Sequence, residues 1–233
     1  MRSNRLTHIG LMGLTLILSA GCASLRDAAD AGVSRAVPAT PDPAARYVIY
    51  LHGRIIEEEG ERPTSPRYGT YEYRDVLRAL ARPGLHVISE RRPAGTDMDV
   101  YAGKVLAQIA ALRAAGVPAD RITVVGFSKG GGIAVRVAAR NEESDLRFVF
   151  LAACGDWAFV PEVQVAGRIL SINEASDDLV APSCEPLFAH ARQVPEHDEI
   201  RIETGQEHGA FYRPNPVWVN PVTAWALGVY SQP

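Results

Sequence analysis

Six short apolar runs recur along the chain after residue 45, and polar residues, Gly or Pro bound them. Most are rich in Val, Ile, Phe and Tyr, as expected for buried strands. The last run alternates apolar and charged positions, which indicates a strand with one exposed face. These runs occupy residues 47–51, 85–89, 122–125, 147–151, 169–172 and 199–202.

Segments with a helical spacing of apolar residues separate these runs. In residues 100–115, for example, Val105, Ile109 and Leu112 fall on one face of a helix. Strands that alternate with helices predict an α/β fold, with a mostly parallel sheet of about six or more strands and helices on both faces. Residues 154–168, between the fourth and fifth strands, are too few for a large lid. The remaining helices are predicted at 71–81, 128–139 and 182–191.

The N-terminal segment has the pattern of a bacterial secretion signal. Residues 1–5 include two arginines, residues 9–20 are uncharged and mostly apolar, and small residues precede Cys22. The apolar stretch is short for a membrane-spanning helix. The sequence from Leu18 to Cys22 resembles a lipoprotein cleavage site, which implies a signal peptide over residues 1–21 and a lipid on Cys22. An ordinary signal peptide with an incidental Cys is the alternative.

The segment after this signal predicts a linker between the lipid and a folded domain. Residues 22–45 are rich in Ala, Asp and Pro, which is typical of a flexible tether. The domain is therefore expected over residues 46–233. Ala23 is not the Asp that would favour the inner membrane, so the resemblance implies a lipid-anchored protein of the bacterial cell envelope, at the outer membrane or in the periplasm.

Composition narrows the classes of partner. Of the 233 residues, 47% are hydrophobic, and the formal net charge is −3. The chain can bury one sizeable core, but it lacks a broad basic field for nucleic acid. No metal-ligand cluster and no dinucleotide fingerprint occur in the sequence. We therefore expect no metal and no organic cofactor, and a small-molecule or acyl substrate.

A candidate nucleophile lies in the sequence Gly126-Phe127-Ser128-Lys129-Gly130. G-x-S-x-G is a weak signal alone, but here it follows a β-branched run and precedes a segment of small residues. That strand-turn-helix setting is the one in which the motif exposes a serine hydroxyl at the end of a strand. Glycines suit the turn because side chains there would collide with neighbouring backbone. The alternative is a structural glycine-rich turn.

Two later segments carry a candidate base and acid. His208 follows the last predicted strand, and an imidazole can take the proton of a serine and return it to a leaving group. Asp177 and Asp178 follow the fifth strand, where a carboxylate could orient the imidazole. The chain order serine, acid, histidine is that of the nucleophile-elbow hydrolases. A surface-loop histidine and an Asp-rich turn are the alternatives.

Backbone N–H groups near the serine could stabilise a developing oxyanion. One would come from Lys129, directly after the serine, and the other from Arg54, in the loop after His52 and Gly53. We expect the Lys129 side chain to point outward, so that only its amide takes part. The His52 ring is expected to brace the loop rather than to act as a second base.

These motifs together resemble the α/β-hydrolases, from about Arg46 to the C-terminus. The strand-His-Gly, G-F-S-K-G, strand-acid and E-H-G segments occur in the family's order. The chain is most similar to the small lidless esterases and thioesterases. In many such enzymes the acid precedes two variable residues and a Val, with a Pro close behind, and Asp177 fits this spacing through Val180 and Pro182. Asp178 fits it less well and is the alternative acid.

The resemblance implies a serine hydrolase that cleaves an ester or thioester through an acyl-enzyme. An amidase or acyltransferase with the same triad is one alternative. A non-catalytic binding module anchored in the envelope is another, and the complete triad argues against it. With Cys22 lipidated, Cys154 and Cys184 remain in an oxidising compartment, which favours a disulfide between them over two free thiols.

Two other segments of the sequence are rich in charged residues. Glu57, Glu58, Glu59 and Glu61 indicate a solvated polar loop. The Arg91-Arg92 pair ends the second strand, where an arginine could attract an anionic substrate or form a surface salt bridge.

Overall fold

Seven parallel strands form the main sheet in the computed structural model, which describes residues 32–81 and 84–231. Neighbouring strands pair parallel throughout. From one edge to the other they are β1 (Val33–Ser34), β5 (Leu85–Ile88), β2 (Arg46–Leu51), β6 (Ile122–Phe127), β7 (Arg147–Leu151), β8 (Arg168–Glu174) and β9 (His197–Ile202). All six predicted runs form strands of this sheet.

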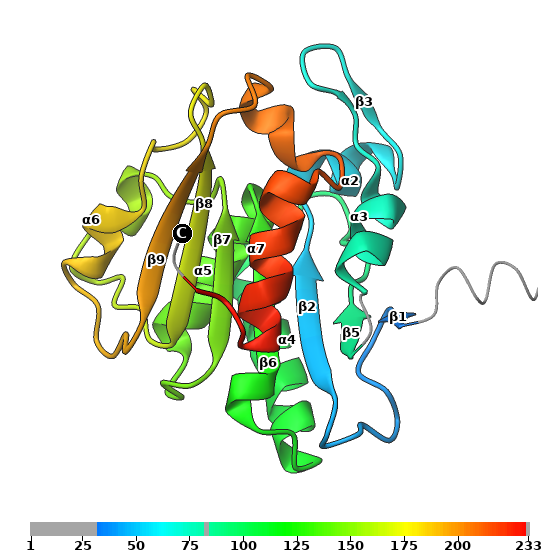
Figure 1. Ribbon diagram of the computed structural model, residues 1–233, viewed down its shortest axis with the longest axis vertical. Helices are drawn as coiled ribbons and strands as arrows, with labels where there is room; N and C mark the ends of the chain where they lie inside the picture. Colours follow the sequence, from blue (N-terminus) through cyan, green and yellow to red (C-terminus); the bar gives the residue numbers. More distant parts are fainter. Residues whose placement is uncertain (1–31, 82–83, 232–233) are drawn as a thin grey trace, which may run out of the picture. The chain divides into compact units, whose positions relative to one another are not determined.

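Helices cover both faces of the sheet (Figure 1). α4 (Met98–Ala114) and α5 (Lys129–Arg140) share one apolar core with the sheet. α3 (Tyr73–Leu80) and α7 (Pro216–Leu227) share the other, and α7 runs in front of the central strands in Figure 1. The predicted α/β architecture is therefore confirmed.

Local sequence explains where two of these helices begin. The Asp97 side chain accepts hydrogen bonds from the backbone N–H groups of Asp99 and Val100, which caps α4. Asn215 caps α7 in the same way and is followed by Pro at the first helical position. α7 was not predicted, because its apolar residues surround the helix rather than form one stripe.

Shorter elements follow the carboxyl ends of the strands or connect them. α2 (Arg54–Glu59) follows β2, and a hairpin of β3 (Thr64–Ser65) and β4 (Gly69–Thr70) precedes α3. Three more elements lie in the later loops and one precedes β6. They are η2 (Asp156–Ala158), α6 (Glu185–Phe188), η3 (Glu207–Phe211) and η1 (Ala119–Arg121). The predicted helix at 182–191 is thus reduced to the single turn of α6.

The domain begins earlier than the sequence predicts. Residues 32–45 were placed in the tether, yet β1 pairs with β5 and Val37 and Ala45 pack against the core. The compact unit starts at Gly32. A strand of two residues leaves no apolar run in the sequence, which is why the predicted boundary lies at residue 46.

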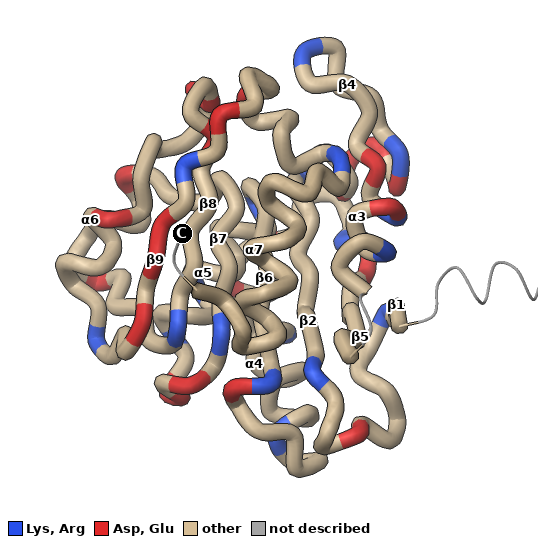
Figure 2. Tube along the Cα trace, viewed as in Figure 1, with Lys and Arg blue, Asp and Glu red and all other residues tan. Residues whose placement is uncertain are grey.

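The predicted signal peptide and Cys22 lie outside the described residues. Among the residues that are described, no helix is long and apolar enough to cross a membrane. Acidic and basic residues are interspersed along the described chain, as Figure 2 shows.

Candidate active site

Ser128 sits on a strained turn between β6 and α5. Its backbone has a φ of 54°, in the left-handed region that a non-glycine residue seldom adopts. A Cβ at Gly126 would collide with the backbone of Gly130, and a Cβ at Gly130 would collide with the carbonyl of Leu51. Glycines at these positions therefore permit the close approach that holds the serine above the strand end, as the sequence predicts.

His208 lies between Ser128 and Asp177. Its Nε2 is 2.8 Å from the Ser128 Oγ, and its Nδ1 is 2.6 Å from Oδ2 of Asp177. An ionised carboxylate can only accept, so the geometry fits Nδ1–H donating to Asp177, with Nε2 free to accept the serine proton. Both His208 and Asp177 are buried. Three loops, after β6, β8 and β9, thus bring the three predicted residues into one hydrogen-bonded line.

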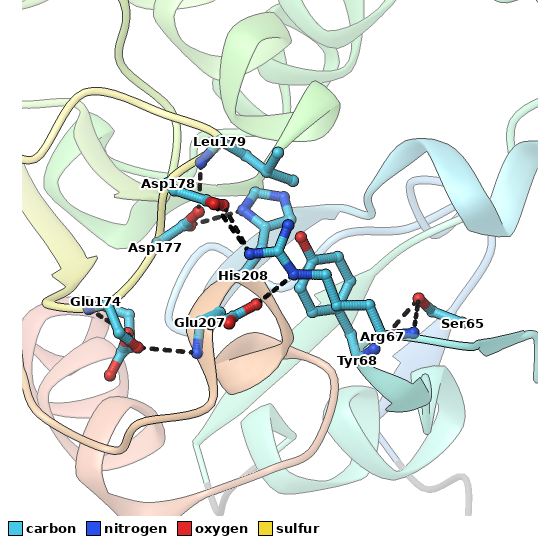
Figure 3. Close-up of polar contacts among 10 residues, drawn as sticks. Ser65, Arg67, Tyr68, Glu174, Asp177, Asp178, Leu179, Glu207 and His208 are labelled. Atoms are coloured by element: carbon cyan, nitrogen blue, oxygen red, sulfur yellow. Dashed lines mark hydrogen bonds and ion pairs between the residues drawn. The ribbon is translucent and has the colours of Figure 1, made fainter.

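Asp178 is not part of this line, and its carboxylate bonds to Arg67 instead (Figure 3). Its side chain is exposed and bonds to the guanidinium of Arg67, and this hydrogen bond lowers the pKa of the Asp178 carboxyl. Asp177 holds its own loop instead, because its Oδ1 accepts the backbone N–H of Leu179 at 2.9 Å. Of the two neighbouring carboxylates, only Asp177 meets the imidazole in this structure.

Glu174, at the end of β8, connects the loop of the acid to the loop of the histidine. Its Oε2 accepts hydrogen bonds from Ser176, and its Oε1 accepts the backbone N–H groups of Thr204 and Gly205. Burial opposes ionisation of this carboxyl, but the hydrogen bonds outweigh it and lower the pKa of Glu174. This contact was not predicted, because the only sign of Glu174 in the sequence is an acid at the end of a buried strand.

Two backbone amides near Ser128 lack a partner within their helices. Lys129 and Arg54 are the first residues of α5 and α2, so their N–H groups have no intrahelical acceptor. Both residues and Ser128 line one cavity, and a Cβ built on Gly53 would lie 3.7 Å from the Cβ of Ser128. The two predicted oxyanion donors therefore belong to residues that line the same cavity as Ser128.

The Lys129 side chain does not point outward, contrary to the prediction. Its Nζ donates to Oε2 of Glu57 at 2.5 Å, while Nε of Arg92 donates to Oε1 of Glu57 at 2.7 Å. The side chains of Glu57 and Arg92 are fully buried and that of Lys129 nearly so. Glu57 is thus part of a helix and an internal ion-pair network, not of a solvated loop, and Arg92 is neither a surface residue nor a substrate anchor.

His52 braces the loop after β2, as expected. Its Nε2 accepts the backbone N–H of Arg92 at 2.9 Å, and its Nδ1 lies 2.9 Å from the carbonyl oxygen of Gly53. Burial, with a contribution from the charge of Arg92, lowers the pKa of His52 to about 3. A ring that stays neutral and has both nitrogens engaged cannot serve as a second base.

The cavity beside Ser128 has a volume of about 1000 Å³. Apolar side chains and charged side chains both line it, and Cys154 contributes to the wall. A disulfide joins Cys154 to Cys184, with an S–S distance of 2.00 Å, as the sequence analysis expected. The apolar set includes Ile55, Met98, Phe127, Trp157, Leu179 and Val180, and the charged set includes Arg54, Glu58, Glu59, Arg136 and Asp156. Among the described residues, no three His, Cys, Asp or Glu side chains gather as a metal site would require.

The comparison with solved structures gives the fold. A thermostable esterase matches with a TM-score of 0.52 and 18% identity, over 82% of this chain and 57% of that one. Est1E from Butyrivibrio proteoclasticus, solved with ferulic acid bound, matches with a TM-score of 0.55 and 14% identity, over 82% of this chain and 92% of that one. The chain has the α/β-hydrolase fold. No family model and no curated protein matches the sequence.

Within this α/β-hydrolase fold, two residues of the β3–β4 hairpin lie near the histidine and were not predicted from the sequence. Arg67 contacts Asp178 and Glu207, and the Tyr68 ring centroid is 6.0 Å from that of His208. Nothing in the sequence near Arg67 or Tyr68 indicates these contacts, since their partners are more than a hundred positions away.

Proposed function

We propose that this protein is a serine hydrolase that cleaves a carboxylic ester or thioester through an acyl-enzyme. The observation that carries the proposal is the unbroken line Ser128-His208-Asp177 at the wall of an open cavity. The fold shared with two esterases supports the same class of reaction. A hydrogen-bonded serine and histidine would have no evident use in a module that only binds.

In the proposed first half-reaction, the Ser128 Oγ attacks the carbonyl carbon and its proton moves to Nε2 of His208. Asp177 stabilises the imidazolium through Nδ1–H without taking the proton itself. The oxygen of the tetrahedral intermediate accepts hydrogen bonds from the amides of Lys129 and Arg54. When the intermediate collapses, His208 gives its proton to the departing alcohol or thiol, and the acyl group stays on Ser128.

The second half-reaction repeats these steps with water. His208 takes a proton from a water molecule, which attacks the acyl-enzyme carbonyl, and then returns the proton to the Ser128 Oγ as the acid leaves. Residues 154–165 hold only η2, bends and turns, so the cavity wall there is a short loop. This geometry supports substrates that enter from solvent, with an apolar part against Trp157 and Leu179.

A fluorophosphonate probe tests the proposal, because it labels only an activated serine. Wild-type protein should be labelled, Ser128→Ala and His208→Ala should lose nearly all labelling, and Ser144→Ala should label like wild type. Ser144 is a suitable control because it lies in the loop before β7, at the amino ends of the parallel strands, whereas Ser128 follows the carboxyl end of β6. An unlabelled wild-type protein would contradict the proposal. Full labelling of Ser128→Ala would show that another residue is the nucleophile. A panel of acyl esters, thioesters and amides then ranks the substrate classes.

We also propose that Cys22 carries a lipid and anchors the domain in the bacterial envelope. Support comes from the apolar run that ends in Gly21-Cys22. Mass spectrometry of protein purified from membranes should find a mature chain that begins with an acylated Cys22. A mature N-terminus at another residue would contradict the anchor without affecting the proposed hydrolase.

A further inference from the structure

A single arginine of the β3–β4 hairpin connects the two loops that hold His208 and Asp177. Nε of Arg67 donates to Oε2 of Glu207 at 2.5 Å, and Nη2 of Arg67 lies 3.0 and 2.9 Å from the two carboxylate oxygens of Asp178. Figure 3 shows the guanidinium between these two acids. Glu207 directly precedes His208 and Asp178 directly follows Asp177, so the guanidinium binds one residue away from each.

The backbone at Glu207 needs support from such contacts. Its φ of 52° lies in the left-handed region, where a side chain with a Cβ is strained. The hydroxyl of Ser176 accepts the Glu207 N–H at 3.2 Å, and Arg67 holds the Glu207 side chain. Because Glu207 is the residue before the candidate base, any relaxation of its φ would turn the imidazole away from Ser128.

The β3–β4 hairpin also contacts Gly209, the residue directly after His208. A Cβ built on Gly209 would lie 2.8 Å from the Cβ of Tyr68, so the two backbones are in close contact. The Tyr68 ring is inclined at 56° to the imidazole, and the Arg67 guanidinium carbon is 5.2 Å from the centre of the Tyr68 ring. Arg67 and Tyr68 together therefore limit the positions open to the segment 207–209.

We propose that Arg67 is a positioning residue, which keeps His208 in line with Asp177 and Ser128 by binding Glu207 and Asp178 at once. This inference rests on the proposed hydrolase function. The Arg67 side chain is 48% exposed, and exposed ion pairs contribute little to global stability. Its effect should therefore fall on the geometry of proton transfer, where a small displacement changes the rate strongly.

The test compares Arg67→Gln, Glu207→Gln, the double variant and Arg67→Lys in full-length protein, with an ester that the wild type hydrolyses. Arg67→Gln should lower kcat by about tenfold, the scale expected for a displacement well below 1 Å, and leave KM and the melting temperature nearly unchanged. Glu207→Gln should give part of this loss, because Arg67 still binds Asp178, and the double variant should lose no more than Arg67→Gln, because Glu207 acts through Arg67. Arg67→Lys should recover part of the rate. Its ammonium restores the positive charge but lacks the planar guanidinium that binds both carboxylates. Arg113→Gln breaks a comparably exposed pair with Glu143 and should behave like wild type.

Several outcomes would overturn the inference. Wild-type kcat in Arg67→Gln, a loss confined to KM or to the melting temperature, or additive effects of the Arg67 and Glu207 substitutions would each do so. The dependence of kcat on ionic strength is a second test. Salt screens the ion pairs of Arg67, so 1 M salt should lower the kcat of the wild type more than the kcat of Arg67→Gln. A wild-type protein that neither binds the fluorophosphonate nor hydrolyses any ester would instead refute the proposed function.

Discussion

Glu57 offers a sharp test of how the loop after β2 is held. Its carboxylate accepts from two cations at once, Nε of Arg92 at 2.7 Å and Nζ of Lys129 at 2.5 Å. The substitution Glu57→Gln keeps the shape of the side chain and removes its charge. The amide oxygen can still accept from one cation, but the amide NH₂ then faces N–H donors of the other.

The expected cost follows from burial. The side chains of Glu57 and Arg92 are fully buried, and that of Lys129 is 12% exposed. Removing one partner of a buried ion pair costs about 3–5 kcal/mol, because it leaves an uncompensated charge in the interior. With an m-value of about 2–3 kcal/mol per M of urea, the unfolding midpoint should fall by about 1–2.5 M.

Urea unfolding of wild type, Glu57→Gln and Glu58→Gln measures this directly. Glu58 is the neighbouring residue and is exposed, so its substitution should change the free energy of unfolding by no more than about 0.5 kcal/mol. Equal midpoints for the two variants would refute the reasoning from burial. Replacing Glu57, Arg92 and Lys129 together by apolar residues of similar size should recover much of the loss, since no charge then remains unpaired.

Two further predictions concern the acid and the disulfide. Asp177→Asn should lower kcat by roughly 10³–10⁴-fold, because the imidazole loses its orienting carboxylate, and Asp178→Asn by only a few-fold, since the Asp178 carboxylate bonds to Arg67 and not to the imidazole. The opposite ranking would reassign the acid. Thiol titration of unreduced, denatured protein should find neither Cys154 nor Cys184 free, and two free thiols would exclude the bridge. Replacing both by Ser should cost about 3–4 kcal/mol of stability, from a loop with a sequence separation of 30 residues.

Apolar patterning predicts the sheet well because burial in a parallel sheet leaves a continuous signal. Every residue of β6 is buried, and the sequence before Ser128 is apolar there except for Thr123. Elements held by few apolar contacts escape this method. β1 has two residues, and the hairpin of β3 and β4 pairs only two residues on each side. α7 did leave a signal that was not used, in Asn215 and Pro216 at its start and Gly228 at its end.

The proximity of Ser128, His208 and Asp177 was predictable because each follows the end of a strand, and the parallel topology brings those ends together. The charged residues around them were not predictable. Glu57 stands in a run of acids that suggests solvent, and its partners Arg92 and Lys129 are 35 and 72 positions away. Hydropathy assigns a charge to the surface, whereas the structure buries this one because two cations from other segments converge on it.

The three members of the proposed triad share one feature that ties their geometry to a single segment. Each has a charged neighbour in the sequence: Lys129 after Ser128, Asp178 after Asp177 and Glu207 before His208. Lys129 binds Glu57 of α2, and the other two bind Arg67 of the hairpin. Both partners belong to residues 54–70, between β2 and α3. The sheet therefore determines where the three loops begin, and residues 54–70 hold these loops in position. Substitutions within residues 54–70 should alter turnover even where they contact no residue of the proposed triad.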